Sequence, residues 1–543
     1  MCAAHTYSVG VVPRIDLSLT VHKFLSEQEA AEKAIIRYFY ESGGDIDYFY
    51  SFINEIRQIT FEDENSEIIG QIRSKTLDIT RGSYLSVEAK IVLLRTIYEA
   101  GCFSKELMRE LVKLTAEINN NISLKYWLLS DLSRIWFLYP KILYDEYWTE
   151  KKQIMRDCAR ELRLNWNPPA YTGENNPNIC VMATFLGCEM KANPVTLGIS
   201  RIVRALSNRG YKLHVIETLP LLNDSSMGIM KPIFCLSQSV TILRKEELLQ
   251  YFPEDIEFYQ ISNAMIKNRL QDILDLICKI NPFCILEFTN DYIPISYYYY
   301  QNYPTIYCSL TKVGYSSSFF HKYVIPNEEA VVYSPILEEQ ALRLPLCIEY
   351  IKPLRTFSRK EYGLTEADIV IITVGYRLPI DISNKLAEQM CSLLRSNKKI
   401  KWLIVGCSEL PYIKKYHEDL IGKSIIFISY EADLPGLYQI CDIYLNPDRS
   451  GGGTTIAWAM QHKLAIVSPL GAADGTNIIG KNNALPFEND LAPFIDRLSK
   501  DSELLYLEKE KYAKIAAKWD INLFTDGLIQ GMNELAENFT QRI

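Results

Sequence analysis

Three glycines and two threonines follow one another at residues 451–455, where an apolar segment gives way to a helical one. The apolar segment 441–445 predicts a buried strand, and the helix is expected to begin at one of the threonines. Glycine lets a backbone approach a ligand closely, and a helix N-terminus presents free N–H groups at the positive end of its dipole. This pattern favours a phosphate or diphosphate site, whose candidate residues are Gly452, Gly453, Thr454 and Thr455. The plainer interpretation is a glycine-rich turn with a threonine N-cap.

Two basic residues lie upstream of this turn. Arg377 comes directly after the apolar strand expected at 368–374, and Lys385 lies in the helix expected at 382–396. A cation near the carboxyl end of a parallel strand stabilises the negative charge of a phosphate bound there. The alternatives are an arginine in a surface turn and a lysine on the exposed face of a helix.

Three further polar residues follow strands in the same half of the chain. Tyr430 and Glu431 come after the short strand expected at 424–429, and Asp474 lies in the loop 469–477. The carboxylate of Asp474 is suited to accept hydrogen bonds from ribose or sugar hydroxyls. Tyr430 and Glu431 are equally compatible with an ordinary loop, and Asp474 with the turn of its Ala-Asp-Gly sequence.

The elements that position these residues change character along the chain. Helical periodicity comes first, a segment rich in Pro, Gly and Asn follows, and strands then alternate with amphipathic helices in two successive regions. Such alternation predicts parallel sheets with helices on both faces. The expected fold is α/β, with two tandem doubly wound Rossmann-like domains preceded by an all-α domain. The expected parts are a helical domain 1–164, a linker 165–178, domains 179–345 and 346–520, and a C-terminal helix 521–543.

Local signals place some element boundaries. Gly101 is expected to end one helix, and Ser104 to cap the next, at 105–118. After the first strand of the first alternating region, a helix carries one apolar face and stops at Gly210. That face consists of Ile199, Ile202, Val203 and Leu206.

Composition narrows the class of protein. The 543 residues are 48% hydrophobic and 23% charged, which is typical of a soluble globular protein. The formal net charge of -8 argues against a general nucleic-acid binder, which needs a basic face. No run of 18 apolar residues predicts a spanning helix, and the first residues lack the pattern of a signal peptide. Oligomeric state cannot be inferred from these features.

The cysteines and histidines suggest neither a disulfide framework nor a metal site. The 13 cysteines include no CxxC pair, and their odd number fits reduced thiols. No metal-ligand spacing is found among Cys and His. We therefore expect a cytoplasmic protein that uses neither a metal nor a tightly bound cofactor.

The second alternating region resembles the nucleotide-sugar domain of GT-B glycosyltransferases. Its matching motifs, in chain order, are Val374-Gly-Tyr-Arg377, Trp402-Leu-Ile-Val-Gly406, Leu437-Tyr-Gln-Ile-Cys-Asp442, Leu445-Asn-Pro447, Gly451-Gly-Gly-Thr-Thr455 and Ala465-Ile-Val-Ser468. Their order and spacing agree with that fold, and the first region is a looser match to the acceptor-side domain. The resemblance covers residues 175–530 and leaves the helical domain outside it.

One departure narrows the resemblance. The chain has a looser similarity to family-4-type glycosyltransferases. Many retaining GT-B enzymes carry two glutamates around this turn, but no Glu lies between Glu431 and Glu488. Trp458 or Ala459 stands where the second would fall. The Gly-Gly-Gly-Thr-Thr form is more similar to the O-GlcNAc transferase family and the bacterial protein N-glucosyltransferases. Those enzymes also place a helical domain before the GT-B unit, where it helps to hold a protein acceptor.

The resemblance implies roles for the candidates. The glycine and threonine residues with Arg377, or in second place Lys385, would hold the donor diphosphate, while Tyr430 and Glu431 would lie near the nucleobase. A general base is expected from the first alternating region, at a strand end. The candidates for that base are Glu189, Asp291 and His321.

The function expected is a metal-independent, inverting glycosyltransferase that moves a sugar from a UDP-linked donor to a protein or peptide. Two alternatives stay open. One is transfer to a surface polysaccharide or a lipid-linked glycan. The other is a non-catalytic GT-B subunit that binds a catalytic partner or acceptor, which the missing glutamates favour and the glycine-threonine motif opposes.

Overall fold

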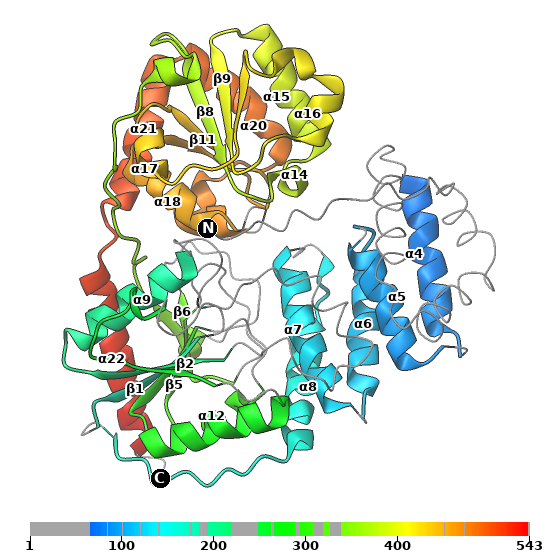
Figure 1. The fold of residues 1–543 in the computed structure, drawn as a ribbon, viewed down its shortest axis with the longest axis vertical. Helices are drawn as coiled ribbons and strands as arrows, with labels where there is room; N and C mark the ends of the chain where they lie inside the picture. Colours follow the sequence, from blue (N-terminus) through cyan, green and yellow to red (C-terminus); the bar gives the residue numbers. More distant parts are fainter. Residues whose placement is uncertain are drawn as a thin grey trace, which may run out of the picture. The chain divides into compact units, whose positions relative to one another are not determined.

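The computed structural model describes residues 66–540, apart from 84, 100, 120, 139–141, 174–175, 184–185, 187–193, 219–247, 262–264, 289–293, 309–318, 326–337, 450 and 472. The chain divides into two compact units (Figure 1). The larger unit consists of Leu164–Leu219, Val240–Ser262 and Arg269–Ile543, and the smaller one is mainly Met1–Arg163.

The described part of the smaller unit is helical. Its helices are α4 (Ser66–Arg81), α5 (Val87–Glu99), α6 (Lys105–Glu117), α7 (Ile122–Leu138) and α8 (Tyr147–Leu162). The predicted boundary between α5 and α6 is confirmed, since Gly101 has a φ of +83° and the Ser104 hydroxyl accepts a hydrogen bond from the Leu107 N–H at 3.3 Å. Residues 1–65 of the expected helical domain lie outside the described residues.

The first sheet of the larger unit is parallel throughout, in the order β3-β2-β1-β4-β5-β6-β7. Its strands are β1 (Asn178–Ala183), β2 (Lys212–Glu217), β3 (Glu257–Gln260), β4 (Cys284–Phe288), β5 (Thr305–Cys308), β6 (Lys322–Ile325) and β7 (Ala341–Arg343). Associated helices are α9 (Pro194–Ser207), α12 (Ile266–Ile280), the short α13 (Ser296–Tyr299) and α22 (Ile521–Thr540). The C-terminal helix α22 thus packs on the sheet formed by the earlier part of the unit.

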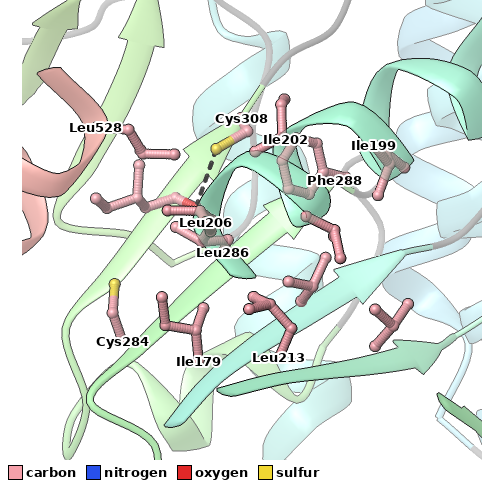
Figure 2. Close-up of a cluster of buried hydrophobic side chains, with 14 of the residues drawn as sticks. Ile179, Ile199, Ile202, Leu206, Leu213, Cys284, Leu286, Phe288, Cys308 and Leu528 are labelled. Atoms are coloured by element: carbon pink, nitrogen blue, oxygen red, sulfur yellow. Dashed lines mark hydrogen bonds between the residues drawn. The ribbon is translucent and has the colours of Figure 1, made fainter. Parts of the chain in front are cut away.

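One face of this sheet is covered by α9 and α22. Figure 2 shows Ile199, Ile202 and Leu206 of α9 gathered with apolar side chains of the strands, and Leu528 of α22 beside them. The predicted apolar face of α9 is confirmed, because all four of its residues are buried. Burying such side chains stabilises a fold by about 1.5–3 kcal/mol each, so α9 and α22 fix the sheet from its covered face.

The second sheet is also parallel, in the order β10-β9-β8-β11-β12. Its strands are β8 (Ile369–Val374), β9 (Ile400–Val405), β10 (Ile425–Ile428), β11 (Ile443–Leu445) and β12 (Ala465–Val467). The helices around it are α14 (Leu378–Asp381), α15 (Asn384–Ser396), α16 (Pro411–Tyr416), α17 (Leu434–Tyr438), α18 (Gly453–Gln461), α19 (Ala473–Ile479), α20 (Leu491–Lys500) and α21 (Ser502–Ala516). Two separate apolar cores pack on this sheet, which is why its strands read as continuous apolar runs.

The predicted tandem of doubly wound sheets is therefore confirmed. The strands expected at 368–374, 424–429 and 441–445 are present as β8, β10 and β11, each within the predicted range. The edge strands β3 and β7 were missed, because they are short and only one of their seven side chains, that of Phe258, is buried. None of the helices in the described parts of the chain is both long and apolar enough to cross a membrane.

A buried carboxyl group ends β2. Glu217 is 1% exposed, and its Oε2 accepts a hydrogen bond from Gln260 Nε2 at 2.7 Å. Burial raises the pKa of Glu217 from its ordinary 4.5 to about 7, while the Gln260 hydrogen bond and the charge of Arg269 act in the opposite direction. The folded chain binds the proton of the Glu217 carboxyl group more tightly than the unfolded chain does. The protonated carboxyl group therefore stabilises the fold fully below about pH 4.5, and this stabilisation is lost as the pH rises through about 7.

We predict that Glu217→Gln raises the melting temperature at pH 8, because a neutral amide replaces a buried charge and still accepts the Gln260 hydrogen bond. The gain should correspond to at most about 3 kcal/mol and should vanish near pH 4.5. Melting curves across this pH range test it, with the exposed Glu366→Gln as the control. A variant that melts like the wild type at pH 8 would contradict the prediction.

Candidate functional site

The second sheet reverses its strand order between β8 and β11. The chain moves outward from β8 through β9 to β10 and then returns to place β11 on the other side of β8. In open parallel sheets, ligands bind outside the carboxyl ends of the strands at such a switch point. The turns that follow β8 and β11 are therefore the expected walls of a site, and they hold Arg377 and the glycine turn (residues 451–453) respectively.

The glycine turn leads directly into α18. Gly451 and Gly452 have φ values of +94° and +83°, a backbone conformation that favours glycine. Gly452 occupies the N-cap position without a capping side chain, and the first backbone hydrogen bond of the helix runs from the Ile456 N–H to the Gly452 carbonyl at 3.1 Å. The N–H groups of residues 453–455 thus lack partners within the helix and lie at the positive end of its dipole. This is the geometry expected of an anion site.

The two threonines differ in their surroundings. The Thr455 hydroxyl donates to the Gly452 carbonyl at 2.8 Å and contacts the Tyr444 hydroxyl at 2.7 Å, while its own carbonyl accepts from the Tyr438 hydroxyl at 3.1 Å. Thr454 is half-buried, and its hydroxyl has no hydrogen-bond partner among the described residues. Thr455 therefore fixes the start of α18, and Thr454 offers a hydroxyl for a ligand.

The two candidate cations lie after β8. Arg377 occupies the N-cap position of α14, is 23% exposed at its side chain and lies 3.6 Å from the carboxylate of Asp381. Lys385 is exposed in the first turn of α15. Along the chain, Arg377 is nearer than Lys385 to the end of β8.

The remaining donor-side candidates follow β10 and β12. Tyr430 is 62% exposed, and Glu431, half-buried beside it, accepts a hydrogen bond from the Asp433 N–H at 2.8 Å. Asp433 in turn caps α17. Glu431 thus shapes the loop, and Tyr430 leaves its ring free for a planar ligand. Asp474 lies in the first turn of α19, with its side chain outside the described residues.

The structure adds one residue that the sequence did not identify. Arg449 lies between β11 and the glycine turn, and its side chain is only 3% exposed. Its Nη2 donates to the Val374 carbonyl at 2.8 Å and to the Tyr444 hydroxyl at 3.2 Å, and its Nε donates to Asn446 Oδ1 at 3.0 Å. In space, its guanidinium lies where Gly375 and Gly452 have no side chains, but no local sequence pattern marks Arg449 as buried.

Asp381 lies beside both arginines. Its Oδ2 is 3.7 Å from Arg449 Nη1, and its Oδ1 is 3.6 Å from Arg377 Nη2. Burial raises the pKa of Asp381 above its ordinary value, although both guanidiniums act to lower it. With Asp381 ionised, two guanidinium charges face one carboxylate, so this group of three side chains carries a net positive charge, which suits an anion.

The general-base candidates belong to the first sheet, whose own switch point lies between β1 and β4. Glu189 follows β1 and Asp291 follows β4, but both lie outside the described residues. His321 lies at the amino end of β6, where its Nδ1 accepts a hydrogen bond from the Thr305 N–H at 3.2 Å. Its ring also packs against Phe539. In open parallel sheets, ligands bind at the opposite edge, outside the carboxyl ends of the strands, so this placement does not favour His321 as the base.

No group of three or more His, Cys, Asp or Glu side chains in the described parts of the chain is arranged to hold a metal ion.

Comparison with solved structures identifies the fold. A mutant O-GlcNAc transferase from Thermobaculum terrenum aligns over 97% of this chain and 99% of its own, with a TM-score of 0.51 and 12% identity. A glycosyltransferase from Rickettsia africae aligns over 67% of this chain and 100% of its own, with a TM-score of 0.49 and 15% identity. The GT-B fold expected from the sequence is therefore confirmed. No protein-family model matches the chain, and a search of curated proteins finds no match.

We predict that Gly375→Ala disturbs this site, because the added Cβ would lie 2.3 Å from Arg449 Nη1 and displace the guanidinium. The expected loss of stability is about 1–3 kcal/mol, measured by thermal or urea unfolding. Gly70→Ala in α4 is the matched control, since nothing lies within 4 Å of its Cβ. That change should stabilise the helix by about 0.5–1 kcal/mol. Equal stability of the Gly375 variant and the wild type would refute the predicted clash.

Proposed function

We propose that the protein is a glycosyltransferase that moves a sugar from a nucleotide-sugar donor to a protein or peptide acceptor. The observation that carries the proposal is the uncapped N-terminus of α18 behind the glycine turn, at the switch point of the second sheet. The fold shared with an O-GlcNAc transferase is consistent with it. The proposed donor is UDP-linked, on the resemblance of the Gly-Gly-Gly-Thr-Thr segment.

In the proposed reaction, the bond between the sugar C1 and the diphosphate oxygen breaks, and its electron pair leaves on the diphosphate. The N–H groups of residues 453–455, the Thr454 hydroxyl and Arg377 stabilise that charge without a metal ion. Tyr430 stacks against the nucleobase, and Asp474 accepts hydrogen bonds from donor hydroxyls. Lys385 is the second choice for the cation.

The acceptor nucleophile attacks C1 and gives its proton to a carboxylate of the first sheet. Glu189 and Asp291 are the proposed bases, since each follows a strand beside the switch point of that sheet. We propose inversion at C1, because the paired glutamates of many retaining enzymes are missing. The helical unit supports a protein or peptide acceptor, since it provides additional binding surface.

A screen of nucleotides tests the donor class. We expect one of UDP, GDP, ADP and CDP, with UDP first, to raise the melting temperature equally with and without Mg²⁺. A ligand at 100 times its dissociation constant adds about 2.7 kcal/mol of stability, and calorimetry then measures the affinity. Failure of all four to bind would favour the non-catalytic subunit, and stabilisation only with Mg²⁺ would overturn the metal-free mechanism.

Single substitutions test the residues. We predict that Arg377→Ala and Thr454→Ala each weaken binding of that nucleotide by about tenfold, which corresponds to about 1.4 kcal/mol. Neither should change the melting temperature without ligand appreciably, because both side chains are partly accessible. The control is Arg497→Ala, an exposed arginine in the last turn of α20. If both site variants bind the nucleotide as tightly as the wild type does, Arg377 and Thr454 are not part of the donor site.

A further inference from the structure

We infer that Arg449 is a positioning residue for the donor diphosphate, and that it acts by holding the turn after β8 and the glycine turn in one fixed arrangement. The inference rests on the proposed function and names a residue that never touches the substrate. It explains why a buried cation stands at the carboxyl edge of the second sheet.

Arg449 joins two segments that are far apart in the sequence. On the β8 side its Nη2 donates to the Val374 carbonyl at 2.8 Å, 75 residues away. On the β11 side its Nε donates to Asn446 Oδ1 at 3.0 Å. A guanidinium has five N–H donors in a planar fork, so one side chain can bond to both strand ends at once. Movement of either turn would break these hydrogen bonds in a buried place, where an unpaired donor is costly.

A short path leads from the guanidinium to the start of α18. Arg449 Nη2 donates to the Tyr444 hydroxyl at 3.2 Å, and that hydroxyl contacts Thr455 Oγ1 at 2.7 Å. Thr455 then bonds to the Gly452 carbonyl. Arg449 therefore fixes the direction in which the N–H groups of residues 453–455 point.

Both turns approach the guanidinium at a glycine. A Cβ at Gly375 would lie 2.3 Å from Arg449 Nη1, and a Cβ at Gly452 would lie 2.5 Å from Nη2. The guanidinium thus fits between the two backbones, and the spacing of the two walls of the site is set by its thickness. A lysine ammonium is compact and lacks the planar fork, so it cannot reproduce this spacing.

The charge of Arg449 has a second consequence, because Asp381 lies next to it as well as next to Arg377. Arg449 is the buried partner and Arg377 the more exposed one, at 3% and 23% of their side chains. If Arg377 turned toward a diphosphate, the positive charge of Arg449 would still neutralise the Asp381 carboxylate. The buried arginine thereby allows the outer one to engage the ligand without leaving a carboxylate unpaired.

The experiment compares a nucleoside diphosphate with its nucleoside, because only the former has the group that Arg449 positions. The probes are whichever of UDP, GDP, ADP and CDP stabilises the wild type most, and the matching nucleoside. We expect Arg449→Lys to weaken binding of the nucleoside diphosphate by about tenfold or more, as measured by calorimetry. The affinity of the nucleoside, measured by competition in NMR, should change by less than about twofold.

Tyr444→Phe serves as a second variant that keeps the buried ring and removes only the hydroxyl between Arg449 and Thr455. This variant should weaken binding of the nucleoside diphosphate but not of the nucleoside, and by a smaller factor than Arg449→Lys does. Tyr512→Phe is the matched control, since Tyr512 is equally buried in α21 and its hydroxyl bonds to the Asn483 carbonyl at 3.4 Å. That control should leave both affinities unchanged.

The outcomes separate the inference from the proposed function. Suppose that the wild type binds the nucleoside diphosphate. The positioning role is then overturned if the two variants lose affinity for the diphosphate and the nucleoside equally, or lose affinity for neither. If Arg449→Lys does not fold, the selectivity of Tyr444→Phe decides alone. Failure of the wild type to bind any nucleoside diphosphate would remove the proposed function, and the inference with it.

Discussion

A guanidinium cannot be buried unless acceptors surround it, and this requirement organises the carboxyl edge of the second sheet. Arg449 donates to carbonyl, amide and phenol oxygens where the ends of β8 and β11 come together. Those two strands are neighbours at the point where the strand order reverses. Its hydrogen bonds join the turn after β8 to the segment before the glycine turn, and Asp381 lies beside it.

The same helix that begins at the glycine turn is held at its other end by the segment connecting the two sheets. Gln461 Nε2 donates to the Ile348 carbonyl at 3.0 Å, and the His462 ring contacts the Ile351 carbonyl at 3.1 Å. Asp433 accepts hydrogen bonds from the N–H groups of Leu354 and Arg355. The connecting segment is therefore bound to the second sheet's helices, and α18 has fixed partners at both ends.

Much of this architecture is predictable from local sequence, because buried parallel strands are continuous apolar runs and glycine marks backbone that other residues rarely adopt. The strands β8 and β10 follow from such signals. The helix α18 begins at Gly453, one residue before the threonines at which it was expected to begin, and Gly452 rather than a threonine is its N-cap. The position of Arg449 does not follow from such signals, since its partner Val374 lies 75 residues away and no local pattern marks an arginine as buried. The position of His321 at the amino edge is likewise not predictable from local sequence, because it depends on the register of β5 and β6.

The interlock of one arginine with two glycines also constrains how this sequence can change over time. A Cβ at position 375 or 452 would meet the Arg449 guanidinium, and at position 452 the φ of +83° also favours glycine. The first substitution at any of the three positions is therefore harmful unless the others change with it. Among descendants of this sequence, we expect substitutions at positions 375, 449 and 452 to occur together rather than independently.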